Sequence, residues 1–135
     1  MRAHESYDYA VIRVVPRVER GEFMNVGVIV SCEQTRYLEA AIEIDEARLR
    51  ALDPHLDLAT LRRHLGAIQR ICKGGADAGP IGLLPQRARF HWLTARRSAI
   101  IQTSTVHMGR CGDMDAILAH LMDRMVRLPA PLTRA

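Results

Sequence analysis

Residues 7–32 read YDYAVIRVVPRVERGEFMNVGVIVSC, and the rest of the chain is organised around them. This stretch holds two runs rich in Val and Ile on either side of a charged connection, and branched side chains at this density favour β-strands. Pro16 cannot donate to a strand ladder, so the first strand is expected over 7–15 and the second over 24–32. Apolar residues are nearly continuous in both runs, which is typical of strands buried on both faces.

A third strand is expected over 37–44, where apolar and polar residues alternate as they do in a strand with one wet face. Three successive strands with short connections predict an antiparallel meander. In the second strand, strict alternation would place Met24, Val26 and Val28 on one face. Gly27 interrupts that strand, and a glycine there often marks a bulge or a close approach by another group.

Helical periodicity dominates the rest of the chain. Asp45 and Asp57 are expected to cap helices over 46–52 and 58–73, because an aspartate can accept hydrogen bonds from the first free N–H groups of a helix. The other expected elements are a surface loop over 74–82, a short helix over 85–93, a fourth strand over 99–102 and a last helix between Asp113 and Pro129. The pattern predicts an α+β fold with a mainly antiparallel sheet of about four strands packed by helices.

The whole chain, residues 1–135, is expected to form a single domain with an ordered core over about 7–128 and a mobile tail over 129–135. The three cysteines form no CxxC pair and no two histidines have metal-ligand spacing, so neither a metal nor a cofactor is expected. No run approaches the roughly 18 apolar residues of a membrane helix, and no secretory leader is recognisable. These features predict a cytoplasmic protein with reduced thiols.

Charge is distributed unevenly along the chain. Residues 1–57 carry 7 Arg and 11 acidic residues, whereas residues 58–112 carry 9 basic residues and only one acidic residue, Asp77. Such a basic segment can meet phosphate or carboxylate ligands, or it can dock on the acidic part of its own chain. A net charge of +4 is modest, so nucleic acid is expected to bind weakly and without specificity at most.

Arg13 and Asn25 interrupt the apolar character of the first two strands. An unpaired guanidinium is costly to bury, so Arg13 is expected to reach a carboxylate, a carbonyl, water or a ligand. Glu22 and Glu43 are its candidate partners within the chain. A ligand contact at Arg13 and Asn25 is the alternative interpretation.

Two further groups of residues are candidates for function. Arg96 and Arg97 follow Trp92, and arginine beside an aromatic ring can bind phosphate and stack a base. The structural alternative is that Trp92 and Phe90 anchor a helix in the core while the arginines stay solvated. His107 follows a run of hydroxyl residues, and a histidine beside Ser or Thr can act as a general base.

The segments YDYAVIRVVPRVERGEFMNVGVIV and RFHWLTARRSAIIQTSTVHMG resemble a bacterial family catalogued as domain of unknown function 3037, over about residues 7–126. The landmarks of the resemblance are Tyr9, Arg13, Pro16, Glu22, Asn25, Gly27, Phe90, Trp92, Leu93, Thr94, Ser98, Gln102, Ser104, His107 and Gly109. The resemblance implies a small, single-domain cytosolic protein with no assigned reaction. Some members are encoded beside HipA-type kinases, which implies an accessory role.

Two hypotheses of function follow. The first is a non-catalytic binding or accessory module for a protein partner, such as a HipA-type kinase, or for an anionic ligand; its oligomeric state is left open. The ligand-binding residues would be Arg13, Asn25, Gln102, Ser104, Arg96 and Arg97. The alternative is a small phosphoester hydrolase or transferase that uses His107 with Arg13 and Asn25. One pocket shared by Arg13, Asn25, Gln102, Ser104 and His107 would favour the enzyme, whereas their dispersal beside an exposed apolar patch would favour the binding module.

Overall fold

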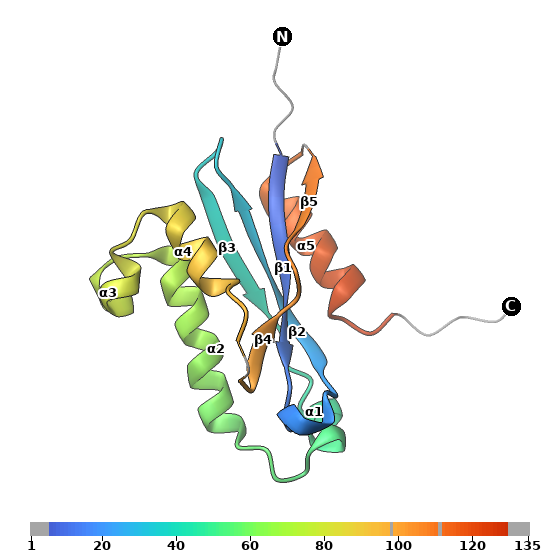
Figure 1. Ribbon diagram of the computed structural model, residues 1–135. Coiled ribbons are helices and arrows are strands. Elements are labelled where there is room, and N and C mark those ends of the chain that lie inside the picture. Colours follow the sequence, from blue (N-terminus) through green and yellow to red (C-terminus); the bar gives the residue numbers. More distant parts are fainter. Residues whose placement is uncertain (1–5, 98, 111, 130–135) are drawn as a thin grey trace, which may run out of the picture.

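The computed structural model describes residues 6–97, 99–110 and 112–129. An antiparallel sheet lies at its centre with helices on both faces, which confirms the expected α+β fold (Figure 1). The strands are β1 (Ser6–Val14), β2 (Met24–Cys32), β3 (Tyr37–Ile42), β4 (Ile101–Thr103) and β5 (His107–Arg110). Their order is β3-β2-β1-β4, and β5 also pairs with β1. Since β4 pairs with residues 12–14 and β5 with residues 6–9, the two follow one another along the same side of β1.

Three of the helices begin where capping residues were expected. The helices are α1 (Glu46–Leu52), α2 (Leu58–Lys73), α3 (Gly79–Gly82), α4 (Gln86–Leu93) and α5 (Met114–Met125), with 3₁₀ turns η1 (Val18–Arg20) and η2 (Ala76–Ala78). Asp45, Asp57 and Asp113 each accept a backbone N–H from the first turn of the helix that follows. None of the described helices combines the length and the apolar character needed to cross a membrane. Residues 1–5 and 130–135, which include most of the expected mobile tail, lie outside the described residues.

The local structure differs from the expectation in three places. Residues 74–82 were expected to form a loop, but they hold η2 and α3, closed by a hydrogen bond of 2.9 Å from the Gly75 N–H to the Gly82 carbonyl. The fourth strand lies at 101–103 instead of 99–102, and β5 was not expected at all. Its four residues have little strand propensity of their own, and they are extended because β1 offers them backbone partners.

Separate apolar cores cover the two faces of the sheet. In Figure 1, α2 lies on one side of the sheet and α5 on the other. The first core joins Ile12 and Val14 of β1 to buried residues of α1, α2 and α4. The second core joins β2 to Met114, Leu121 and Met122 of α5. Because helices cover both faces, the central strands β1 and β2 can be apolar almost throughout.

A bulge in β2 divides its apolar residues between the two cores. Ile12 pairs with Gly27 but Arg13 pairs with Asn25, so Val26 is an extra residue in the ladder. Val26 therefore packs on the α2 side, whereas Val28 packs on the α5 side, and the expectation of one shared face was wrong. Gly27 fits the bulge because a Cβ atom there would lie 2.5 Å from the Ala41 carbonyl oxygen.

Candidate functional site

A groove of about 630 Å³ lies between α2 and residues 92–103, the segment that leads from α4 to β4. Ten of the seventeen residues that line it are aliphatic, and six are polar. The lining residues are Leu56, Asp57, Thr60, Leu61, His64, Ala67, Ile68, Ile71, Trp92, Leu93, Ala95, Arg97, Ala99, Ile100, Ile101, Gln102 and Thr103. A hollow of this size and character is typical of a site that binds an apolar group.

One wall of the groove is a single face of α2. Its members recur at spacings of three and four residues from Asp57 to Ile71, which places them on one side of the helix. Leu61 and Ile71 of this stripe are buried in the core, whereas Ile68 is only partly buried. The stripe extends past the sheet because α2 packs mainly on β3, so its outer part faces β4 across the groove.

The opposite wall carries the tryptophan and one of the candidate arginines. Trp92 is 39% exposed, so the interpretation of this side chain as a core anchor was wrong, although Phe90 is buried as expected. The Arg97 guanidinium lies 4.1 Å from the centre of the Trp92 ring and donates to the Trp92 carbonyl. Arg96 is exposed nearby. Neither arginine makes an ion pair with an acid in the parts of the chain that the structure describes.

Ser104 has a structural position where β4 passes into β5. Its N–H donates to the Val11 carbonyl at 2.8 Å, and its Oγ accepts the Val11 N–H at 2.9 Å. The same Oγ donates to the Thr105 carbonyl. The side chain thus replaces a backbone acceptor at the break between the two strands, and the buried Val11 N–H is satisfied.

Three of the predicted polar residues stand side by side across the sheet. Arg13 is the register partner of Asn25 on β2 and of Gln102 on β4. The Asn25 Nδ2 donates to the Met125 carbonyl at 3.0 Å, and the Arg13 guanidinium lies 4.2 Å from the centre of the Phe23 ring. The Arg13 Nε and the Asn25 Oδ1 are both buried and lack a hydrogen-bond partner among the described residues.

The expected ion pair between Arg13 and a glutamate is absent from the described residues. Glu22 pairs with Arg20, and Glu43 pairs with Arg127. Both pairs are exposed at the sheet ends, where water competes for the charges. Stacking on Phe23 takes the place of the expected carboxylate contact of Arg13.

His107 lies away from this polar row. It pairs with Tyr9 in the sheet, and the two rings are 5.3 Å apart. Since Tyr9 and Arg13 are four residues apart on one strand, about 13 Å separates them at roughly 3.3 Å per residue. Five residues would favour the enzyme if they shared one pocket: Arg13, Asn25, Gln102, Ser104 and His107. Only Gln102 of these lines the groove, and Asn25 lines a second hollow of about 430 Å³ near the end of α5.

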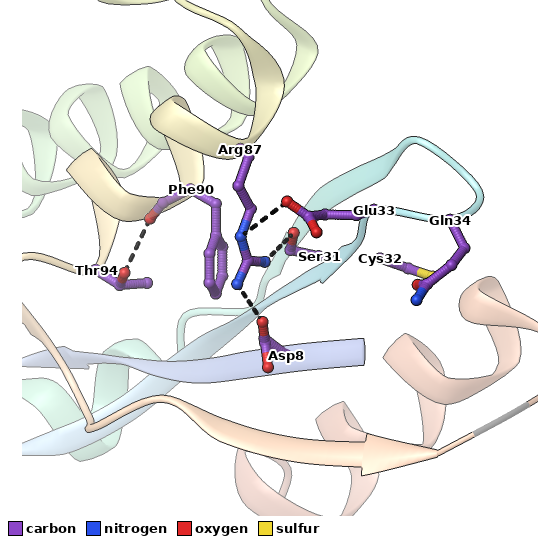
Figure 2. A network of polar contacts seen from close by, with 8 residues as sticks. All are labelled: Asp8, Ser31, Cys32, Glu33, Gln34, Arg87, Phe90 and Thr94. Atoms are coloured by element: carbon purple, nitrogen blue, oxygen red, sulfur yellow. Dashed lines mark hydrogen bonds and ion pairs between the residues drawn. The ribbon is translucent and has the colours of Figure 1, made fainter. Parts of the chain in front are cut away.

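Two other arginines of the basic segment hold the fold together. Figure 2 shows Arg87 extending from α4 to the sheet, where it pairs with Asp8, donates to the Ser31 Oγ at 3.0 Å and lies 3.5 Å from Glu33. Arg89 donates to the carbonyls of Ile71 and Cys72 at the end of α2. For these two, docking on the rest of the chain is the interpretation that the structure supports.

Two titratable groups with raised pKa values, Cys72 and Tyr37, lie outside the groove. Burial raises the pKa of the Cys72 thiol to about 12, with a smaller contribution from the Glu39 charge, so the reactive thiolate is scarce at neutral pH. Burial also raises the pKa of Tyr37, which donates to Asp115. Within the described ranges, no three His, Cys, Asp or Glu side chains gather closely enough to hold a metal ion.

The fold and the groove define the class of protein: an α+β domain with an open sheet edge beside an apolar groove. Residues 9–126 match the model of the family described as "Protein of unknown function (DUF3037)", so the chain belongs to that family, and the resemblance seen in the sequence is confirmed. No curated protein matches the chain. No solved structure matches it either.

Sequence reasoning missed the groove because its residues have the pattern of a core. Ile68 and Leu61 lie on the apolar stripe of α2, and a stripe does not show how much of it the sheet will cover. One signal was present in the sequence. Residues 99–109, AIIQTSTVHMG, contain no Asp, Glu, Lys, Arg or Pro, which is unusual for a strand at the edge of a sheet.

Proposed function

We propose that the protein is a non-catalytic binding module that docks an apolar segment of a partner protein in the groove between α2 and residues 92–103. The observation that carries this proposal is the groove itself, with about 630 Å³ between largely aliphatic walls. Its volume lies within the range of sites that enclose several side chains or a drug-sized ligand. Filling it would remove apolar surface from water at roughly 25 cal/mol per Å².

The dispersal of the polar candidates favours binding over catalysis. General base catalysis needs the histidine within hydrogen-bond reach of the group it deprotonates. His107 is exposed on β5, about 13 Å along the sheet from the row that contains Arg13 and Asn25. A hydrolase that used these three residues on one phosphoester would need them around one point.

The shape and chemistry of the groove favour a protein partner over a small anion. An inorganic anion would gain little from aliphatic walls, whereas an apolar peptide segment would bury them. Arg97, which lines the groove, and the exposed neighbouring residue Arg96 then serve as the rim that orients the partner, in agreement with the common pattern of an apolar centre and a polar border. The resemblance makes a HipA-type kinase the first partner to test.

The groove is tested with the fluorescent probe 1-anilinonaphthalene-8-sulfonate, which brightens in apolar sites. We expect saturable binding to the full chain and its loss in Ala67→Trp, because the indole would fill the groove from α2. Leu83→Glu is the matched control, since Leu83 is 70% exposed and does not line the groove. Circular dichroism would verify that both variants fold.

Two results would contradict the proposal. One is the absence of saturable probe binding to the parent protein. The other is probe binding to folded Ala67→Trp at the affinity of the parent, because the bright site would then lie elsewhere. Ile68→Glu places a charge in the groove and provides a second variant if Ala67→Trp does not fold.

A further inference from the structure

The edge of the sheet beside the groove has the features of a surface for strand pairing. β4 is the last strand in the order, so one side of its backbone has no strand partner among the described residues. Natural edges are usually protected by charges or proline, and residues 99–109 contain neither. Ile100, Val106 and Met108 are 47%, 45% and 72% exposed along this edge.

The hydrogen-bond pattern shows which backbone groups face outward. The Val15 N–H donates to the Ile100 carbonyl, and the Ser104 N–H donates to the Val11 carbonyl. The backbone polar groups of Ile100, Gln102 and Ser104 therefore face β1. Because alternate residues of an antiparallel strand point in opposite directions, the N–H and C=O groups of Ile101 and Thr103 point away from β1. Both of these residues also line the groove.

We propose that the partner segment binds as an extended strand added to the edge of β4, with alternate apolar side chains in the groove and acidic residues beside Arg96 and Arg97. This inference rests on the proposed function and states how the partner is recognised. Main-chain hydrogen bonds to Ile101 and Thr103 supply affinity, and the aliphatic walls select the side chains. A helix in the same groove would leave those backbone groups without partners.

The basic charge around the groove selects a partner strand with acidic residues at its flanks. The groove lies almost entirely within residues 58–112, the segment with 9 basic residues and only Asp77 as an acid. Asp57, the acid that lines the groove, already accepts from the N–H and the hydroxyl of Thr60. Arg96 and Arg97 therefore meet a partner carboxylate without an internal competitor in the described chain. A second copy of this protein would bring a like-charged segment to the same edge and is disfavoured.

A phage library of random decapeptides tests the proposal, with the full chain as the target and Ala67→Trp for counterselection. We expect enriched peptides with apolar residues at every second position and Asp or Glu at one flank. Apolar residues spaced by three and four would overturn the strand and leave the proposed function standing. No enrichment over Ala67→Trp would overturn both.

The role of the β4 edge is tested with the best enriched peptide as the probe. Thr103→Pro removes an outward N–H and leaves the bonds to β1 in place, whereas Thr103→Val keeps the N–H and the shape. We expect about tenfold weaker binding to Thr103→Pro and binding within about twofold for Thr103→Val. Equal affinity of both folded variants would overturn strand addition.

Chemical variants of the peptide keep the test decisive if Thr103→Pro does not fold. Two peptides are made, one N-methylated at the odd positions and one at the even positions. Methylation of the N–H groups that face β4 should abolish binding to the parent protein, whereas methylation of the other set should have little effect. Tolerance of methylation at all positions would contradict the strand. The parent protein could also sediment as a dimer that the peptide does not dissociate. That result would assign the edge to a second copy and overturn the proposal.

Discussion

The two edges of the sheet are treated in opposite ways. At the β3 edge, α2 and α5 both pack against the strand, and Glu39 and Glu43 lie along it. The outward carbonyl of Ala40 accepts the Gln69 Nε2 from α2 at 3.2 Å. At the other edge, β4 is short and uncharged and lies beside the groove, and the short strand β5 has a single charged residue, Arg110, at its end.

This difference separates a structural edge from one that is available to a partner. A protein that needed only to stay monomeric would protect both edges, because an unpaired strand invites aggregation. Here charge, a helix and a side-chain hydrogen bond protect only the β3 edge. Amino-acid substitutions and a change of pH would show how far the two edges differ.

Leu65→Ala should disturb the covered side most. Leu65 is 1% exposed in the core beneath α2, and loss of a buried leucine costs roughly 2–5 kcal/mol of unfolding free energy. Chemical denaturation measures the change. Arg63→Ala on the exposed side of the same helix is the control and should stay within about 0.5 kcal/mol. Equal effects of the two changes would show that the packing of α2 on the sheet does not stabilise the fold.

Ser104→Ala should weaken the open edge next. The change leaves the buried Val11 N–H without its side-chain acceptor, which costs roughly 1–3 kcal/mol. Hydrogen exchange at Val11 should accelerate with it. Thr105→Ala serves as the neighbouring control, because the exposed Thr105 side chain has no such role. Normal protection of Val11 in Ser104→Ala would contradict the assigned role of the hydroxyl.

High pH should lower the unfolding free energy through Cys72, which is buried in the core beneath α2. Burial raises the thiol pKa in the folded state to about 12, so the unfolded chain releases its proton first as the pH rises above about 9. The contribution is fully present below pH 9, and roughly 1.4 kcal/mol of unfolding free energy should be lost by pH 10. Stability measured against pH for the parent and for Cys72→Ala gives the difference. If the unfolding free energies of the two proteins changed with pH in parallel, the fold would not raise the pKa of this thiol.

Val106→Lys should have the smallest effect on stability and a clear effect on association. Val106 is 45% exposed on the open edge, so the change in unfolding free energy should stay within about 0.5 kcal/mol. A lysine on an edge strand opposes edge-to-edge pairing, so aggregation on heating should fall. Light scattering measures this, and Ala59→Lys on an exposed position of α2 controls for net charge. Equal suppression by both lysines would attribute the effect to charge alone.

The sequence indicated individual candidate residues, but it did not predict the groove. Arg13 and Asn25 stood out because polar groups interrupt apolar strands, and they prove to be register partners. His107 stood out for its neighbours in sequence, but the register of β5 places it beside Tyr9. Which polar residues meet depends on the pairing of β1 with strands about 90 residues away, and local patterns carry no information on that pairing.

Elements whose signals are local could be read from the amino-acid sequence. Branched apolar runs specified β1 and β2, and Asp45, Asp57 and Asp113 specified where three helices begin, since a cap acts on the N–H groups immediately after it. Gly27 indicated a bulge or a close approach, but only the packed chain settles the bulge at Val26, the strand β5 and the groove. Each of these depends on how much of one element another covers, and burial of that kind is a property of the packed chain.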